Sequence, residues 1–251
     1  MQVKDSTAMV TGAGSGIGRE LALEFARNGA RVVCCGRRQA VLNETVGLIE
    51  DAGGVGLAVT ADITQRDQVR SLVDAAMSRF GSVEILFNNA GSFDSIAGVH
   101  EVDPDVWWRD VTINLLGSLL VIRELLGHMM SANRGIIINM NGGRPVGGSG
   151  YACGKAGLME LTRLMADELR MADSSVMVFS AGPGLVRTAM TELQVNTAAG
   201  RKWIPSTGKH FESGEDIGPD EIARATIKLV ELAKPQWSGK GYGPRTDFSQ
   251  F

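Results

Sequence analysis

Tyr151 and Lys155 stand at a spacing that suits proton transfer. They lie four residues apart in a segment that favours helix, so both side chains are expected on one face of that helix. A phenol has a pKa of about 10 in water, and a nearby ammonium group is needed to stabilise its phenolate near neutral pH. The pair predicts general acid–base chemistry, in which Tyr151 protonates a carbonyl oxygen or removes a hydroxyl proton. The same spacing also occurs by chance, so a second signal is required.

A glycine-rich stretch near the start of the chain supplies that signal. Residues 11–18 read T-G-A-G-S-G-I-G, between a short apolar run and an amphipathic segment. Gly12, Gly16 and Gly18 would let the backbone approach a pyrophosphate, and the free N–H groups of a helix N-terminus would bind it. The alternative, a tight glycine turn without a ligand, is disfavoured by the strand before it and the helix after it. The two signals together predict hydride chemistry on a nicotinamide cofactor.

The end of the second apolar run bears on which nicotinamide cofactor is bound. An acidic side chain at this position hydrogen-bonds a free ribose 2′-hydroxyl and repels a 2′-phosphate. Here the run ends in Gly36, Arg37 and Arg38, with no carboxylate. Guanidinium groups pair well with phosphate, so NADP(H) is favoured over NAD(H). The alternative is that one arginine, Arg38, merely faces solvent.

The elements that must position these groups alternate along the chain. Short apolar runs predict six buried strands, at residues 7–11, 31–35, 55–60, 83–88, 135–140 and 176–180. Between them lie amphipathic segments, such as the one with Ile17, Leu21 and Phe25 at four-residue steps. The alternation predicts an α/β fold with a Rossmann-like, doubly wound parallel sheet, and residues 1–251 are expected to form a single domain. The repeated glycines of residues 239–243 argue against a further strand there.

The segment of residues 188–218 differs from the rest because it lacks strong periodicity while carrying large apolar groups. We expect it to be a substrate loop that acts as a lid within the domain. The side chains expected at the mouth of the site are Phe93, Trp107 or Trp108, Met190, Leu193 and Trp203. Such a mouth favours a bulky, largely apolar ketone or alcohol.

Two further motifs, N-N-A-G at residues 88–91 and Pro183-Gly184, complete a pattern that resembles the short-chain dehydrogenase/reductase family along nearly the whole chain. The resemblance implies an NAD(P)-dependent oxidoreductase that interconverts a carbonyl and an alcohol. It also implies that Asn114 interrupts a helix and holds a water beside Lys155 for proton relay. Besides the three glycines and two arginines above, it places the cofactor against Ser15, Ile17, Asp62, Ile63, Asn89, Ala90, Gly91, Tyr151, Lys155, Pro183, Gly184, Val186 and Thr188. A homodimer or homotetramer is the assembly implied.

One residue of the family pattern is missing. Family members usually carry a serine about 13 residues before the tyrosine, where its hydroxyl polarises the carbonyl. Alignment on Asn139 places Asn141 or Gly142 at that position. The Asn141 amide could act as the donor, Ser149 could swing in, or the contact could be absent. A working enzyme is favoured; the alternatives are an NADP(H)-binding protein with little turnover, and an isomerase or dehydratase that uses the same tyrosine and lysine.

Composition and residue spacing bear on nucleic-acid, membrane and metal binding and on the cellular compartment. A net charge of −3 gives no general attraction for nucleic acid or an anionic membrane. The apolar stretch of residues 115–130 is broken by Arg123 and Glu124, and the N-terminus lacks a basic-then-apolar signal, so we expect a soluble, unprocessed protein. The three cysteines have no C-x-x-C spacing, which fits a reducing cytoplasm, and the three histidines lack ligand spacing, so no metal is expected. The predicted partner is a small-molecule substrate.

Overall fold

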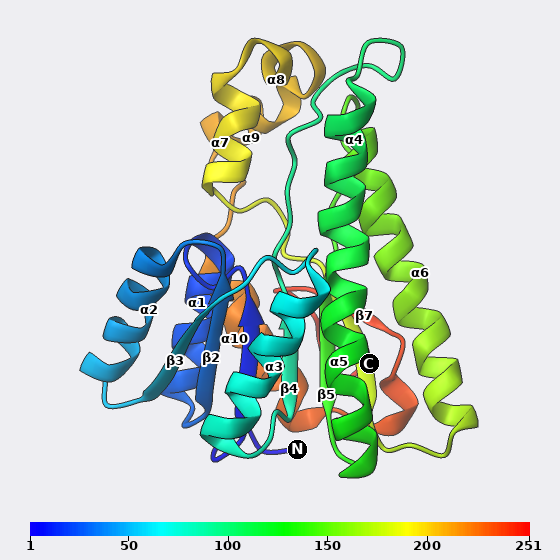
Figure 1. Ribbon diagram of the computed structural model, residues 1–251. Coiled ribbons are helices and arrows are strands. Elements are labelled where there is room, and N and C mark those ends of the chain that lie inside the picture. Colours follow the sequence, from blue (N-terminus) through cyan, green and yellow to red (C-terminus); the bar gives the residue numbers. More distant parts are fainter.

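The computed structural model describes residues 1–251 and contains one seven-stranded parallel sheet (Figure 1). The strands are β1 (Thr7–Thr11), β2 (Arg31–Gly36), β3 (Val55–Thr60), β4 (Ile85–Asn88), β5 (Ile136–Met140), β6 (Met177–Ala181) and β7 (Gly241–Tyr242). Their order across the sheet is β3-β2-β1-β4-β5-β6-β7. From β1 the chain adds β2 and β3 on one side of the sheet, and then β4 to β7 on the other side. Ligands bind in doubly wound sheets at such a switch point, here between β1 and β4. The predicted fold class and the six predicted strands are confirmed, but β3 at the edge of the sheet has no buried residue, contrary to the prediction of a buried strand.

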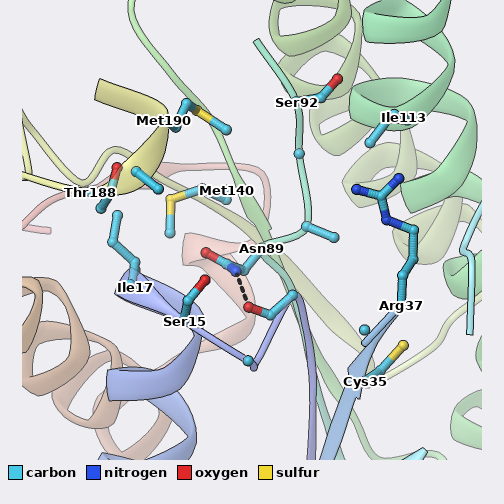
Figure 2. Close-up of a pocket in the computed structure, with 18 of the residues that line it drawn as sticks. Ser15, Ile17, Cys35, Arg37, Asn89, Ser92, Ile113, Met140, Thr188 and Met190 are labelled. Atoms are coloured by element: carbon cyan, nitrogen blue, oxygen red, sulfur yellow. Dashed lines mark hydrogen bonds between the residues drawn. The ribbon is translucent and has the colours of Figure 1, made fainter. Parts of the chain in front are cut away.

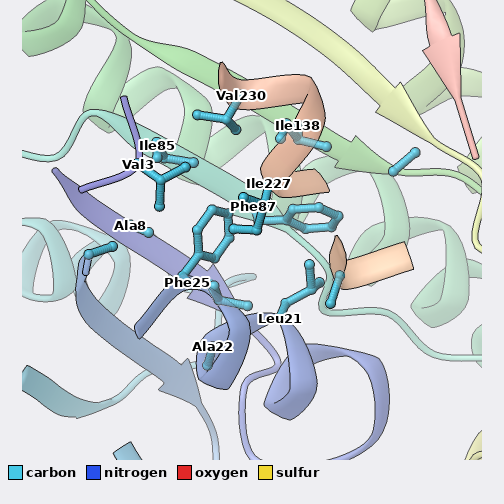
Figure 3. Close-up of a cluster of buried hydrophobic side chains, with 14 of the residues drawn as sticks. Val3, Ala8, Leu21, Ala22, Phe25, Ile85, Phe87, Ile138, Ile227 and Val230 are labelled. Carbon is cyan, nitrogen blue, oxygen red and sulfur yellow. The ribbon is translucent and has the colours of Figure 1, made fainter. Parts of the chain in front are cut away.

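Helices cover both faces of the sheet. One face carries α1 (Gly16–Arg27), α2 (Gln39–Asp51) and α10 (Pro219–Leu232), and the other carries α3 (Arg66–Phe80), α5 (Ser118–Ser131) and α6 (Ser149–Met171). On the first face Phe25 and Leu21 of α1 meet Phe87 of β4 and Ile227 of α10 (Figure 3). The alternation of side chains along β2 places Cys34 in this core and Cys35 in the core of the opposite face.

One continuous helical stretch runs through α4 (Pro104–Val111), the π-helical turn η1 (Thr112–Gly117) and α5. By length and composition it could cross a membrane, and 44% of its most apolar window is buried in the structure. In Figure 1 it runs beside α6, and its α5 part packs on α3 and on the sheet. This packing accounts for its buried apolar side chains, whereas Leu116 and Leu119 remain exposed.

The prediction against a strand in residues 239–243 is wrong. Strand β7 pairs in parallel with β6, with Gly241 opposite Ser180 and Tyr242 opposite Ala181. A Cβ on Gly241 would lie 2.9 Å from the Ser180 hydroxyl oxygen, so the missing side chain permits the pairing that it was expected to weaken. The Tyr242 hydroxyl, hydrogen-bonded to Thr226 at 2.7 Å, anchors the strand to α10.

Residues 188–218 are largely helical, although the sequence predicts a loop. They form α7 (Ala189–Asn196), α8 (Ala198–Trp203) and α9 (Pro205–Ser213), which stand beyond the carboxyl edge of the sheet (Figure 1). Each helix is too short to show periodicity, but its ends carry ordinary signals. The Thr188 and Thr197 hydroxyls cap α7 and α8, and α9 begins at Pro205. The short helix η2 (Pro235–Trp237) precedes β7.

Candidate active site

A cavity of about 560 Å³ lies along the carboxyl edge of the sheet, at the crevice between β1 and β4. Figure 2 shows Arg37 and Cys35 at one end of it and Thr188 and Met190 at the other. The predicted site residues that line it are Gly12, Ser15, Gly16, Ile17, Gly18, Arg37, Arg38, Asp62, Ile63, Asn89, Ala90, Gly91, Asn141, Tyr151, Lys155, Pro183 and Thr188. The fold therefore brings together motifs that lie far apart in the sequence.

The glycine loop has the geometry of a phosphate cradle. A Cβ on Gly18 would lie 2.2 Å from the Gly12 carbonyl oxygen, so the loop can close onto the start of α1 only without that side chain. Gly12 and Gly16 both have positive φ, at 69° and 54°, which other residues rarely adopt. The N–H groups of Gly16, Ile17 and Gly18 donate to no protein atom. Free N–H groups at a helix N-terminus fit a pyrophosphate.

Asn89 braces this loop from the neighbouring strand. Its side-chain Nδ2 donates to the Thr11 carbonyl at 2.9 Å, and its backbone N–H donates to the Thr11 hydroxyl at 3.0 Å. The Ala90 N–H donates to the same hydroxyl at 3.0 Å. These bonds tie the carboxyl ends of β1 and β4 together, so Asn89 fixes the shape of the cavity that it lines.

The two arginines after β2 are free to bind an anion. Arg37 and Arg38 are exposed, both line the cavity, and neither forms an ion pair or a side-chain hydrogen bond within the protein. Arg37 extends along the cavity toward Ile113 in Figure 2. The only carboxylate on the cavity wall is that of Asp62, and its Oδ1 accepts bonds from the Thr64 N–H and hydroxyl.

Three residues predicted as catalytic or cofactor-binding do not line the first cavity. Gly184 lines a second cavity and Val186 lines neither, while Asn114 is fully buried behind the wall. Lining residues that the motifs missed include Ser92, Ile113, Met140, Arg187 and Ala189. Ser92 comes directly after the motif at the end of β4, and Met140 is the last residue of β5. Ligands bind at the carboxyl ends of strands, so this position in the sequence could have identified both residues. Arg187 has no such signal; it is held by Asp216 at 3.4 Å and lies over the Phe211 ring.

Tyr151 and Lys155 project from the first turns of α6 into the inner end of the cavity. The Tyr151 ring stacks on Phe93 with centroids 4.6 Å apart, and burial raises the pKa of its hydroxyl to about 12. Lys155 is 3% exposed, burial lowers its pKa to about 8, and its Nζ donates to the Met140 carbonyl at 2.9 Å. A phenol is neutral near pH 7 even at its ordinary pKa, and burial favours that neutral form further, which is the form that can give a proton to a carbonyl oxygen.

Asn114 lies in the π-helical turn η1, which interrupts the helix at that point. Its Nδ2 donates to the Ser92 carbonyl at 2.7 Å and to the Asp110 carbonyl at 2.8 Å, whereas its buried Oδ1 has no partner. A Cβ on Gly91 would lie 2.6 Å from that Oδ1 and 3.5 Å from Lys155 Nζ. The free acceptor therefore faces the same space as Lys155 Nζ, where it can accept a hydrogen bond from a water.

The loop after β5 shows what stands near the position of the missing serine. A Cβ on Gly142 would lie 1.9 Å from the Tyr151 hydroxyl oxygen, so Gly142 is the loop residue that faces the phenol. The Asn141 side chain lines both cavities and has no hydrogen-bond partner. Ser149 lines neither cavity, and its hydroxyl accepts a bond from Trp107 Nε1 at 3.0 Å. Of the two candidate donors, Asn141 is the one at the site.

A second cavity of about 550 Å³ adjoins the first and reaches from Tyr151 to the helices of residues 189–213. Of the side chains predicted at its mouth, Phe93 and Met190 line it, whereas Trp107, Trp108, Leu193 and Trp203 line neither cavity. The prediction is wrong for these four residues. Their side chains either contact other parts of the protein or face solvent. For example, Trp203 donates to Glu101 at 2.9 Å and so ties α8 to the loop before α4, while Trp108 is 63% exposed.

Comparisons with known proteins agree with this geometry. The family model described as short chain dehydrogenase matches residues 6–199. The cis-4-hydroxycyclohexanecarboxylate dehydrogenase of Sinomonas cyclohexanicum is 36% identical over 190 residues, which cover 74% of this chain and 75% of that protein. The 3beta-hydroxysteroid dehydrogenase 1 of Eggerthella lenta is 34% identical, with 91% and 87% covered. A crystal structure of an actinorhodin polyketide ketoreductase variant with NADPH superposes with a TM-score of 0.85, 26% identity, and 97% and 96% coverage.

The glycine cradle, the tyrosine and lysine at its inner end and the family match over most of the chain lead to one assignment. The chain belongs to the short-chain dehydrogenase/reductase family, whose members are NAD(P)(H)-dependent oxidoreductases that act on alcohol and carbonyl groups.

Proposed function

We propose that this chain is an NADP(H)-dependent oxidoreductase that interconverts a carbonyl and an alcohol, with Tyr151 as the acid/base. The observation that carries the proposal is the position of Tyr151, which lines both cavities, with the buried Lys155 one helical turn further along on the wall of the first. The nicotinamide cofactor, bound in the first cavity, supplies or accepts the hydride. In the reductive direction the Tyr151 hydroxyl donates its proton to the carbonyl oxygen.

The other polar groups of the site support that step. The buried Lys155 ammonium stabilises the phenolate that proton transfer leaves on Tyr151. The free Oδ1 of Asn114, close to Lys155, can hold a water that returns a proton from solvent. The unpartnered Asn141 amide is our candidate for the group that polarises the carbonyl. In this account residues 188–218 act as the lid of the same domain.

The substrate proposal follows from the second cavity. Its volume of about 550 Å³ supports a bulky substrate, and Phe93 and Met190 give it apolar walls beside Tyr151. Toward the lid helices the lining turns polar, and only five of its 18 residues are hydrophobic. We therefore propose a bulky ketone or alcohol as the substrate. Its reacting end lies between apolar side chains beside Tyr151, and its far end carries a polar group.

The experiment that tests the proposal is a screen for NADPH consumption with ketones and quinones, followed by the absorbance of the reduced cofactor. Oxidation of NADPH with at least one bulky ketone is the expected result. Tight NADPH binding without turnover on any member of the panel would favour the alternative of a cofactor-binding protein.

The preference for NADP(H) rests on the free guanidinium groups of Arg37 and Arg38. Replacing both by glutamine should weaken NADPH binding by about a hundredfold to ten-thousandfold, because each charge-assisted bond to the 2′-phosphate contributes about 1.5–3 kcal/mol. NADH binding should change little, because its ribose carries no such phosphate, and it serves as the internal control. Calorimetric titration of both cofactors measures the two effects. A wild-type protein that binds NADH more tightly than NADPH would contradict the assignment.

The role of Asn141 can be separated from that of Ser149. Asn141→Ala should lower kcat by about ten- to a thousandfold without weakening NADPH binding, since a polarising contact forms mainly in the transition state. Ser149→Ala should be nearly silent, because that hydroxyl is bonded to Trp107 outside both cavities. Initial-rate kinetics on the best ketone of the screen compare the variants. Equal rates in Asn141→Ala and wild type would show that the carbonyl is polarised by another group or not at all.

We also propose association into a homodimer or homotetramer and a cytoplasmic location. Exposed leucines on η1, α5 and α6, namely Leu116, Leu119 and Leu164, support a subunit contact along these neighbouring helices. The three free cysteines support a reducing compartment.

A further inference from the structure

The side chains that line the second cavity include basic residues but no acidic ones. The basic residues are Arg144 and His210. His210 lies 3.5 Å from Glu215, which is outside the cavity lining. The guanidinium of Arg144 is therefore the one full positive charge on the wall that no carboxylate of the protein neutralises.

Arg144 stands on the loop between β5 and α6, two residues after Gly142, the residue that faces the Tyr151 hydroxyl. Its side chain is exposed and makes no ion pair, hydrogen bond or aromatic contact within the protein. A guanidinium group offers a planar fork of donors that matches the two oxygens of a carboxylate. The Arg144 guanidinium therefore keeps all its donors available to an anionic group in the cavity.

Gln194 of α7 is an independent observation in the same cavity. It is 7% exposed, and its Oε1 accepts a bond of 2.7 Å from the hydroxyl of Thr207, which is 4% exposed. That bond from α9 orients the amide, and the Gln194 Nε2 donates to no protein atom. The Nε2 group is thus a free donor on the cavity wall, oriented by Thr207 and available to an oxygen atom of a ligand.

We propose that the second cavity recognises a carboxylate at the far end of the substrate, with Arg144 as its ion-pair partner and Gln194 as a hydrogen-bond donor. The inference rests on the proposed function, because it assigns the substrate class of the same site: a bulky oxo acid and the corresponding hydroxy acid. One guanidinium and one neutral amide match the single charge and two oxygens of a carboxylate better than the two charges of a phosphate monoester. The Phe93 and Met190 side of the cavity accommodates the carbon skeleton between carboxylate and carbonyl.

The test uses two keto acids of different length, 4-oxocyclohexanecarboxylate and 4-(4-oxocyclohexyl)benzoate, each beside its carboxamide. The amide keeps an acceptor for Gln194 but removes the charge for Arg144. For wild type we expect at least one acid to have a kcat/KM about tenfold to a hundredfold above that of its amide. Arg144→Gln should bring this ratio close to one. The matched control is Arg134→Gln, an exposed arginine that lines neither cavity and precedes β5 at the other edge of the sheet; it should keep the wild-type ratio.

A second variant and a binding measurement keep the test independent of turnover. Gln194→Met should weaken the acid and its amide alike, because both lose the same hydrogen bond. Calorimetric titration of each compound into the NADP⁺-saturated protein should show the same acid preference and the same loss in Arg144→Gln. Equal binding of acid and amide by wild type, or a preference that survives in Arg144→Gln, would overturn the inference. Binding with the expected preference but no turnover of any ketone would instead count against the proposed function.

Discussion

Replacement of Tyr151 by phenylalanine is expected to lower kcat by about a hundredfold to ten-thousandfold, the usual contribution of a positioned acid/base group. The variant keeps the ring that stacks on Phe93 at 4.6 Å and removes only the hydroxyl. NADPH affinity should therefore stay close to that of wild type. Initial rates and calorimetric NADPH titration measure the two quantities on the same preparation.

The chain offers a matched control because it contains two tyrosines. Tyr242 is buried and lines neither cavity, and its hydroxyl bonds to Thr226 at 2.7 Å. Tyr242→Phe should lower stability by about 1 kcal/mol through the lost hydrogen bond and leave turnover unchanged. If Tyr151→Phe retained wild-type turnover, the proton would have to move by another route.

The second large effect is expected at Gly142, which carries no chemistry of its own. Gly142→Ala places a Cβ where it would lie 1.9 Å from the Tyr151 hydroxyl oxygen, so the phenol must move. A misplacement of about 1 Å at a reacting group can cost about a hundredfold in rate, and we expect a loss of kcat of at least this order. Steady-state kinetics with NADPH and the best ketone test it.

Gly143 provides the control on the same loop. A Cβ on Gly143 would meet nothing within 4 Å, so Gly143→Ala should behave as wild type. The comparison also bears on the missing serine. A serine at 142 would bring the same Cβ against Tyr151, so Gly142→Ser should lose activity as well. Full activity in Gly142→Ala would show that the phenol has another working position.

The sheet could be predicted because most of its strands, such as β1, β4 and β5, are buried on both faces. Apolar runs such as residues 136–138 mark such strands, and their spacing leaves room for a helix between each pair. Strand β7 escaped prediction because two residues carry no pattern, and its stability comes from pairing with β6 and from the Tyr242 hydroxyl. The helices of residues 189–213 escaped because each has too few turns to show a period.

The site could be predicted where its residues belong to motifs at strand ends. The residues that hold those site residues in place could not be predicted, because they act through contacts between segments that are distant in the sequence. Asp110 is fully buried and accepts bonds from the hydroxyls of Ser92 and Ser95 and from two backbone N–H groups. It thereby fixes the loop that presses Phe93 against Tyr151. A single aspartate in an amphipathic helix gives no sign of such a role.

The central claim is that this site transfers a hydride between NADPH and a carbonyl carbon, and isotope labelling tests it most directly. The protein is supplied with a ketone substrate and with NADPH carrying deuterium at the transferable position of the nicotinamide, and the product is analysed by mass spectrometry and NMR. The account predicts deuterium on the carbinol carbon of the alcohol and its loss from the oxidised cofactor, and in Tyr151→Phe both should form more slowly by the same factor as kcat falls. A product formed while the label stays on the reduced cofactor would contradict it and identify an isomerase or dehydratase instead.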